Sequence, residues 1–209
     1  MFTRLRTAAF RIICFVHLVV AWIVYKLQPE GVEGDLRSCI RVVDQFGATV
    51  PAKFIEALVN AEDHRSALHF GVDPIAILRA FMVRIKNGEI QGASTIEQQF
   101  VRVVTKRYER TIGRKVREQF LAAMLSLRRP KRSIASAYLS IAYYGTSIEG
   151  IGGLRKHFGQ NLWDVDYLDA LEFIAQLKYP RPAKDLWIWR YKIDRRVAYI
   201  ARVRSKQPA

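Results

Sequence analysis

The feature of this sequence that most restricts its fold is the helical spacing of its apolar residues. From residue 51 onward, apolar side chains recur three and four positions apart, which is the period of one face of an α-helix. The alternation of apolar and polar residues that marks a half-buried strand is absent. We therefore expect a mainly α fold, with helices at about 51–63, 74–86, 94–104, 111–127, 131–144, 166–177 and 187–204.

Capping signals support two of these helix starts. Asp73 before Pro74 is typical of an N-cap followed by proline at the first helical position. Ser94 and Glu97 match a capping box, in which Glu97 would reach back to the backbone of Ser94. Glycines at 31 and 34 indicate a linker. The predicted organisation is a membrane segment over 1–26, a linker over 27–50 and a globular domain over 51–209.

The N-terminus carries a candidate membrane anchor. Residues 12–25 are apolar except for His17, and Arg4, Arg6 and Arg11 precede them. A spanning helix needs ~17–25 residues, which the run reaches if it starts a little earlier and Arg11 snorkels. A cleaved secretory signal stays open, but no small-residue cleavage site follows, which favours an uncleaved anchor. The arginines predict a cytoplasmic N-terminus and a single pass through a bacterial inner membrane, with the domain on the extracytoplasmic side.

Charge restricts the partners. The formal net charge of +15 indicates an anionic partner, such as nucleic acid, an acidic membrane surface or a phosphorylated molecule. A nucleic-acid binder would need a reading motif or a platform with interleaved aromatic residues, and neither is present, so we expect no nucleic acid. The four histidines lack the spacing of metal ligands, and Cys14 and Cys39 are poorly placed to pair, so we expect no histidine metal site and no disulfide.

A basic stretch over 102–132 surrounds one notable acid. Arg110, Arg114 and Arg117 would share a helical face, which either binds phosphate or is simply solvated. Glu118 lies four residues after Arg114, where an ordinary helical ion pair is expected. Neighbouring cations would keep Glu118 ionised, which suits a group that steers a charged leaving group or a metal better than it suits a general acid.

Glu62 is the second notable acid, because it ends an apolar helical run. It could belong to a solvated ion-pair cluster with the charged residues that follow it. Alternatively, partial burial would make its carboxylate a better proton acceptor and hence a general base. At the next helix start, Ser94 and Gln98 could bind an anion, or could be an ordinary cap and an ordinary helix exterior.

Five segments, taken together and in order, carry more information than any residue alone. They are Glu62-Asp63-His64-Arg65 with His69, Gly71 and Asp73; Gly92-Ala93-Ser94-Thr95-Ile96 with Gln98-Gln99; Arg114-Lys115 with Glu118; Tyr138-Leu139-Ser140 with Tyr143-Tyr144-Gly145; and Leu177 with Pro180. This series resembles the motifs of the peptidoglycan glycosyltransferases of family 51. The resemblance covers roughly residues 52–185.

The resemblance implies a lysozyme-like lobe with a smaller membrane-proximal jaw, preceded by an N-terminal transmembrane helix. It implies an inverting enzyme that polymerises lipid II into β-1,4-linked glycan strands and releases undecaprenyl pyrophosphate. Glu62 would activate the sugar 4-hydroxyl of the acceptor. Glu118 would assist departure of the pyrophosphate, directly or through a divalent cation, Mg or Mn; no cofactor is certain. The groove residues would be Ser94, Gln98, Gln99, Arg102, Arg110 and Lys115, with Arg196 as a further candidate.

The implied partners are lipid II, the growing glycan chain, the inner membrane and other cell-wall synthesis proteins. The last residue, Ala209, leads us to expect a monofunctional enzyme. Several departures from the family pattern leave a second class of function open: a non-polymerising lipid-sugar binding protein or scaffold of the envelope machinery. The departures are Ser66-Ala67 for an aromatic pair, Arg102 for Lys, Val103 for Asn, Ser126, Ser133 and Ser136 for Glu, Ser140 for Asn, and Ala183 and Asp185 for Tyr and Pro.

Overall fold

The computed structural model describes residues 11–16, 19, 22–23, 31–89 and 91–204, and their fold is mainly helical, as predicted. One short antiparallel hairpin interrupts the helices. The α-helices are α2 Val32–Phe46, α3 Ala52–Glu62, α4 Pro74–Asn87, α5 Ile96–Thr105, α6 Ile112–Arg128, α7 Lys131–Ile141, α8 Gly150–Phe158, α9 Tyr167–Ile174 and α10 Leu186–Arg204. The strands are β1 Tyr143–Gly145 and β2 Ile148–Glu149, and the 3-10 turns are η1 Ser66–Leu68, η2 Leu162–Asp164 and η3 Ala175–Leu177.

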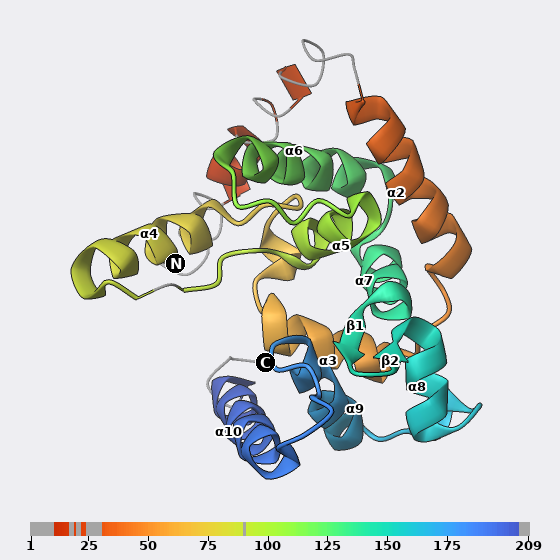
Figure 1. Ribbon diagram of the computed structural model, residues 1–209. Coiled ribbons are helices and arrows are strands. Elements are labelled where there is room, and N and C mark those ends of the chain that lie inside the picture. Colours follow the sequence, from red (N-terminus) through yellow and green to blue (C-terminus); the bar gives the residue numbers. More distant parts are fainter. Residues whose placement is uncertain (1–10, 17–18, 20–21, 24–30, 90, 205–209) are drawn as a thin grey trace, which may run out of the picture.

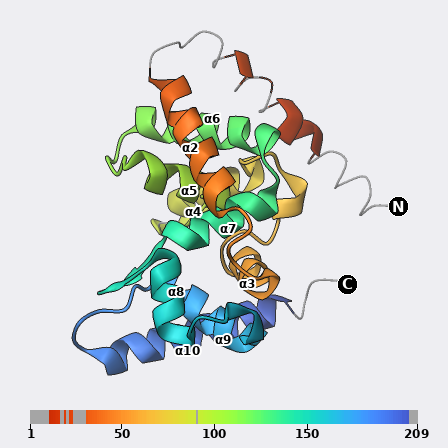
Figure 2. The same ribbon diagram turned by 90° about the vertical axis from the view of Figure 1, so that its right-hand side faces the viewer.

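The helices form two halves that meet around α7. In Figures 1 and 2, α2, α5 and α6 lie in one half and α3, α8, α9 and α10 in the other. Figure 1 shows α4 projecting from the side of the molecule. Helix α5 packs against α2, α6 and α7, and α3 packs against α9. Because α5 is covered on several sides, Ile96, Phe100 and Val101 are all buried in the core. The segments that carry the candidate residues are therefore attached to a well-packed core.

The predicted linker over 27–50 is wrong for residues 32–46, which form α2. Val32, Leu36, Cys39 and Val43 are buried in the core on one face of this helix. Their spacing of four, three and four residues is itself a helical pattern. The two glycines that suggested a linker stand before and inside the first turn of α2, where the packing of that face outweighs their low helix propensity.

Two further details of the sequence prediction are corrected. The cap of α5 is Thr95, whose hydroxyl accepts from the backbone N–H of Gln98 at 3.3 Å, and not Ser94. Glu97 points into the interior and pairs with Lys131 instead of closing a capping box. The helix expected over 131–144 ends at Ile141, because the chain turns into β1 at Tyr143.

Ser136 holds the turn between α2 and α3 against α7. Its hydroxyl accepts from the backbone N–H groups of Thr49 at 3.2 Å and Val50 at 3.1 Å and donates to the carbonyl of Phe46 at 2.8 Å. Ser140, another departure from the family pattern, donates to the carbonyl of Ser136 at 2.9 Å. Both serines therefore find local partners in the folded chain.

The three bonds of Ser136 predict a measurable loss of stability on their removal. Ser136→Ala leaves the buried backbone N–H of Val50 without its partner, whereas the N–H of Thr49 still donates to the carbonyl of Phe46. One buried group left unpaired costs about 1–3 kcal/mol, so we expect the free energy of unfolding to fall by that amount. Denaturant unfolding measures it. Ser38→Ala is the control, because that hydroxyl donates only within its own helix, to Gly34. Equal stability of the two variants would contradict the assigned role of Ser136.

Among the helices in the described part of the chain, none combines the length and apolar character needed to cross a membrane. Most of the predicted anchor over 1–26 lies outside the described residues, so that prediction stays a prediction.

Candidate active site

A groove of roughly 1070 Å³ lies beside the C-terminal end of α3. Its walls come from that helix end, the 91–95 segment, α5 and α10. Glu62, the last residue of α3, lines the groove, and so do Ser94, Gln99 and Arg102. The structure thus brings four of the predicted site residues into one cavity.

Two side chains from distant parts of the sequence hold the Glu62 carboxylate. The amide of Gln99 donates to its Oε2 at 3.3 Å, and the guanidinium of Arg196 donates to its Oε1 at 3.1 Å. The Gln99 carbonyl in turn accepts from the hydroxyl of Tyr138 at 2.9 Å, and Arg196 also donates to the backbone carbonyl of Ala61. The Glu62 side chain is 17 % exposed, so it is partly shielded yet still reaches the groove.

A buried polar chain lies behind this carboxylate. His69 contacts Asp63 through Nε2 at 3.0 Å, and its Nδ1 lies 3.4 Å from the Lys131 ammonium, which also pairs with Glu97. A carboxylate only accepts and an ammonium only donates, so the proton of a neutral His69 belongs on Nε2. Asp63 also accepts from the backbone N–H of Ile96 at 3.3 Å, which ties the end of α3 to the start of α5.

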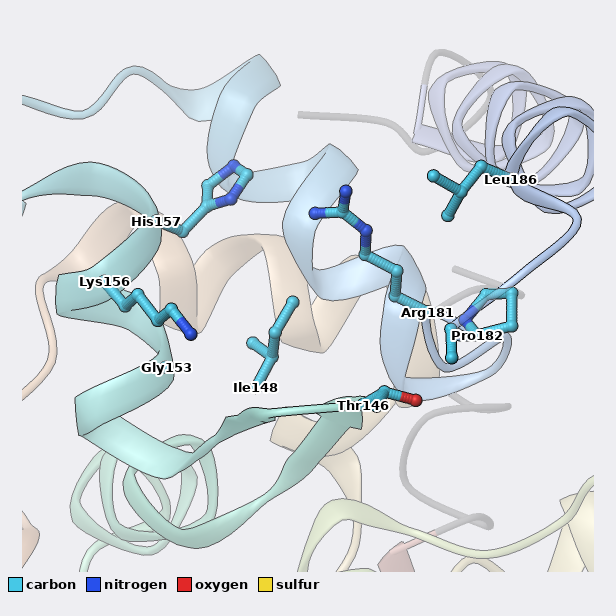
Figure 3. Close-up of a pocket in the computed structure, with 9 residues that line it drawn as sticks. Thr146, Ile148, Gly153, Lys156, His157, Arg181, Pro182 and Leu186 are labelled. Carbon is cyan, nitrogen blue, oxygen red and sulfur yellow. The ribbon is translucent and has the colours of Figure 1, made fainter.

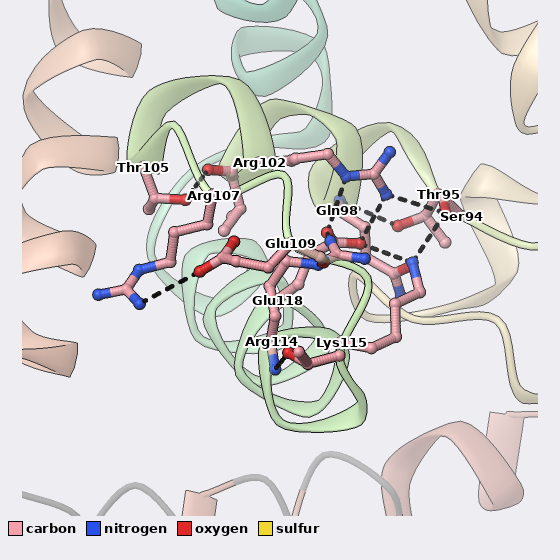
Figure 4. A network of polar contacts seen from close by, with 12 residues as sticks. Ser94, Thr95, Gln98, Arg102, Thr105, Arg107, Glu109, Arg114, Lys115 and Glu118 are labelled. Atoms are coloured by element: carbon pink, nitrogen blue, oxygen red, sulfur yellow. Dashed lines mark hydrogen bonds and ion pairs between the residues drawn. The ribbon is translucent and has the colours of Figure 1, made fainter.

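Three cations surround the second acid, Glu118 (Figure 4). Arg102 donates to both carboxylate oxygens at 2.9 Å, Lys115 donates to Oε1 at 2.7 Å, and Arg114 donates to Oε2. Ser94 accepts from Lys115 at 2.9 Å and from Arg102 at 3.3 Å, which places it in the same cluster. One ionised carboxylate against three cations leaves this cluster with a net charge of about +2, a favourable environment for phosphate.

Glu118 is ionised in this setting. Burial alone would raise its pKa, but hydrogen bonds from Arg102 and Lys115 and the charges of both outweigh burial, and the pKa of Glu118 lies below its ordinary value. The prediction that cations keep this acid charged is confirmed. The predicted ion pair between Arg114 and Glu118, four residues apart on α6, is also present. Glu118 therefore forms an ordinary helical ion pair and at the same time belongs to the cationic cluster.

The residues present do not fit a divalent cation at Glu118. Its carboxylate already accepts four hydrogen bonds, which uses about all the lone pairs that two oxygens offer. Asp63, His69 and Glu97 each place a ligand atom within 4.8 Å of the others, but the ammonium of Lys131 sits among them. A fixed positive charge beside these groups opposes a divalent ion there as well.

Three predicted groove residues do not line the groove: Lys115 lies beside it in the cluster around Glu118, and Gln98 and Arg110 lie elsewhere. Gln98 is fully buried, because it faces the interior of the nearly enclosed helix α5, and it does not line the groove. Arg110 is exposed and precedes α6, so it does not share a helical face with Arg114 and Arg117 as predicted. Arg117 pairs with Asp35 of α2 at 2.6 Å, which makes its contact a structural one.

Sequence reasoning missed much of the groove wall. Six basic or aromatic residues that carry no recognised motif line it from α10 and the segment before it: Lys178, Tyr179, Tyr191, Lys192, Arg195 and Tyr199. These six lie more than a hundred residues after Glu62, and no spacing rule connects them to it. Only the basic and aromatic character of the four on the predicted helix 187–204 could have drawn attention. A further arginine, Arg79, lines the groove from α4.

Comparison with known proteins identifies the family of this chain. A family model described as Transglycosylase matches residues 42–203. Penicillin-binding protein 1A of Aquifex aeolicus (strain VF5) is 33% identical over 153 residues, which cover 71% of this chain and 21% of that protein. Penicillin-binding protein 1A of Escherichia coli (strain K12) is 36% identical over 168 residues, which cover 79% of this chain and 19% of that protein.

A third relative is shorter. Biosynthetic peptidoglycan transglycosylase of Xylella fastidiosa (strain M23) is 34% identical over 140 residues, which cover 66% of this chain and 56% of that protein. The chain thus spans about a fifth of the length of the two penicillin-binding proteins and little more than half of this one. Because the family model covers most of the sequence, the chain belongs to the transglycosylase family, the glycosyltransferases of family 51.

Proposed function

We propose that this protein is a peptidoglycan glycosyltransferase that polymerises lipid II into β-1,4-linked glycan strands and releases undecaprenyl pyrophosphate. One observation carries the proposal: a partly shielded carboxylate, Glu62, lies in a long groove with cationic groups at both sides of it. Arg102 and Ser94 stand on one side, and Lys192 and Arg195 of α10 on the other. Two pyrophosphate-linked sugars, one donor and one acceptor, need such an arrangement.

Glu62 acts as the general base in this proposal. It accepts the proton of the acceptor 4-hydroxyl, whose oxygen forms the new bond to C1 of the donor sugar while the bond from C1 to the pyrophosphate breaks. Attack from the face opposite the leaving group inverts C1, which gives the β linkage. Gln99 and Arg196 hold the carboxylate in position, so that its lone pair is aimed before the substrate arrives.

The cluster around Glu118 stabilises the leaving group. Negative charge grows on the pyrophosphate as its bond to C1 breaks, and preorganised donors aimed at such a charge lower the barrier. Arg102 and Lys115 carry donors that can turn from Glu118 to phosphate oxygens. Glu118 keeps these cations in place when the site is empty of substrate. No step in this scheme passes through a metal ion.

Exposed apolar side chains support a membrane-bound enzyme with a smaller membrane-proximal jaw. On α4, which projects from the body, Leu78, Phe81, Met82 and Ile85 are 58–68 % exposed. Ile12 in the described N-terminal residues is 64 % exposed. Apolar surface of this extent marks an interaction site in a water-soluble domain. We propose that α4 contacts the lipid surface and that a single N-terminal span anchors the domain on the extracytoplasmic side of the inner membrane.

Incubation of the purified full chain with lipid II tests the function. The expected result is a ladder of glycan polymer, with one undecaprenyl pyrophosphate released for each bond formed. Binding of lipid II without polymer would instead support the non-polymerising binding protein.

A further inference from the structure

A second cavity, of about 330 Å³, lies apart from the groove (Figure 3). It is formed by the β1–β2 hairpin, α8 and the segment that leads into α10. Among the described residues that line it, none is acidic, whereas Lys156, His157 and Arg181 contribute three basic side chains and Thr146 a hydroxyl. None of these residues lines the groove that holds Glu62.

Among the described residues, two cations of this cavity, Lys156 and Arg181, lack the carboxylate partner that several arginines elsewhere in the chain have. Arg102, Arg117 and Arg129 each pair with a carboxylate within 3 Å. In the part of the chain that the structure describes, neither Lys156 nor Arg181 forms an ion pair. Two unpaired cations from different segments face one hollow, although like charges repel. An anion bound between them would remove that repulsion.

The backbone holds Arg181 at the cavity wall. Its N–H donates to the carbonyl of Tyr144 at 2.9 Å, and its carbonyl accepts from the N–H of Thr146 at 2.8 Å, so residue 181 pairs with β1 like a third strand. This approach requires glycine at 145, where a Cβ would lie 2.5 Å from the Arg181 backbone. The guanidinium lies over the ring of Trp189, with its carbon 5.6 Å from the ring centroid. A side chain fixed at both ends loses little freedom on binding.

The position of two of these cations has a simpler explanation as well. Lys156 and His157 lie in the last turn of α8, where a positive charge interacts favourably with the negative end of the helix dipole. That explanation does not apply to Arg181, which lies outside any helix and reaches the same cavity from the other side. Lys156 and His157 on α8 and Arg181 from another segment all reach one cavity. A bound anion would explain why these three basic groups lie together.

We propose that this cavity binds a small, soluble, phosphate-bearing molecule. A phosphate monoester carries a charge close to −2 at neutral pH, which matches Lys156 and Arg181 together, and its oxygens suit the fork of an arginine. A carboxylate would neutralise only one of the two. In Figure 1 the hairpin and α8 lie at the end of the molecule away from α4, so the apolar helix proposed to contact lipid is far from this cavity. The ligand is therefore a dissolved molecule and not a lipid headgroup.

His157 is a titratable group that would respond to a bound phosphate. Burial, and then the charge of Arg181, lower the pKa of His157, while Glu172 and Asp169 of α9 oppose that shift. Bound phosphate would favour the imidazolium. The pKa of His157, which lies below 6.5 in the free protein, is therefore expected to rise when phosphate binds.

Titration of the full chain with inorganic phosphate tests the proposal, with the imidazole NMR signals of His157 as a local readout. We expect a saturable shift, and about tenfold weaker binding in Arg181→Gln, a change of ~1.4 kcal/mol. Ala183→Tyr should block binding without removing a charge, because residue 183 lines the cavity. Arg155→Gln is the matched control, since Arg155 is exposed on α8 but outside the cavity.

Each remaining outcome overturns the proposal. These are a shift that does not saturate, equal affinity in wild type and Arg181→Gln, equal binding of acetate and phosphate, and a response only to vesicles that contain anionic phospholipid. The first would mean a solvated basic surface, the third a carboxylate site and the last a lipid site. The measurement uses no lipid II, so its result is independent of the proposed polymerase activity.

Discussion

Glu62→Gln is expected to reduce glycan polymerisation by about 10²- to 10⁴-fold, the usual contribution of a general base. Glutamine keeps the size of the side chain and can still contact Gln99 and Arg196, but it cannot accept the proton of the acceptor hydroxyl. The loss should therefore fall on the turnover number, with lipid II binding little changed. Rates of polymer formation and a direct lipid II binding measurement separate the two effects.

Glu33→Gln serves as the control for this variant. Glu33 is an exposed acid on α2, its side chain is 59 % exposed, and it lies outside the groove. The control should polymerise lipid II at the wild-type rate. Turnover in Glu62→Gln within a factor of two of the control would remove Glu62 from the proposed reaction and leave the groove without a base.

Glu118→Gln should lower both the stability and the activity of the protein. The side chain of Glu118 is 3 % exposed, and its removal leaves Arg102, Arg114 and Lys115 repelling one another. Breaking a buried ion pair typically costs ~3–5 kcal/mol. The three cations are 14–34 % exposed and can be partly hydrated, so we expect a loss of about 3 kcal/mol in the free energy of unfolding, at the lower end of that range.

The same variant carries a pH signature. The pKa of Glu118 in the folded protein lies below its ordinary value of 4.5, so its ionised form stabilises the fold above pH 4.5. That contribution is lost as the pH falls from 4.5 through the folded-state pKa. The difference in unfolding free energy between wild type and Glu118→Gln should therefore be constant near neutral pH and shrink below about 4.5. A difference that grows on acidification would contradict the assigned charge state.

The sequence allowed the site to be predicted where a motif or a helical period was present. Glu62, Gln99 and Arg102 all line the groove, and Glu118 lies within the basic cluster beside it, because short-range patterns identify them. Helix α2 could have been predicted from the spacing of Val32, Leu36, Cys39 and Val43, but two nearby glycines outweighed that signal in our interpretation.

Other features depend on contacts that no local pattern encodes. Whether Gln98 faces solvent or core is decided by the three helices that pack around α5, and its amide turns out to be fully buried. The choice of Thr95 over Ser94 as cap follows from the recruitment of Ser94 by Arg102 and Lys115, a tertiary event. Membership of the family predicted which residues matter, but not which neighbour each one would contact.

The bond between Arg196 and Glu62 joins positions 134 residues apart in the sequence, and this has a consequence for biosynthesis. A ribosome makes Glu62 long before Arg196, and α9, against which α3 packs, is also made late. Closing so long a loop is slow compared with forming a helix. A nascent chain would therefore carry the acid without its guanidinium partner, and the groove would gain its last wall only after α10 had left the ribosome. The order of synthesis thus delays the assembly of the site until the domain is almost complete.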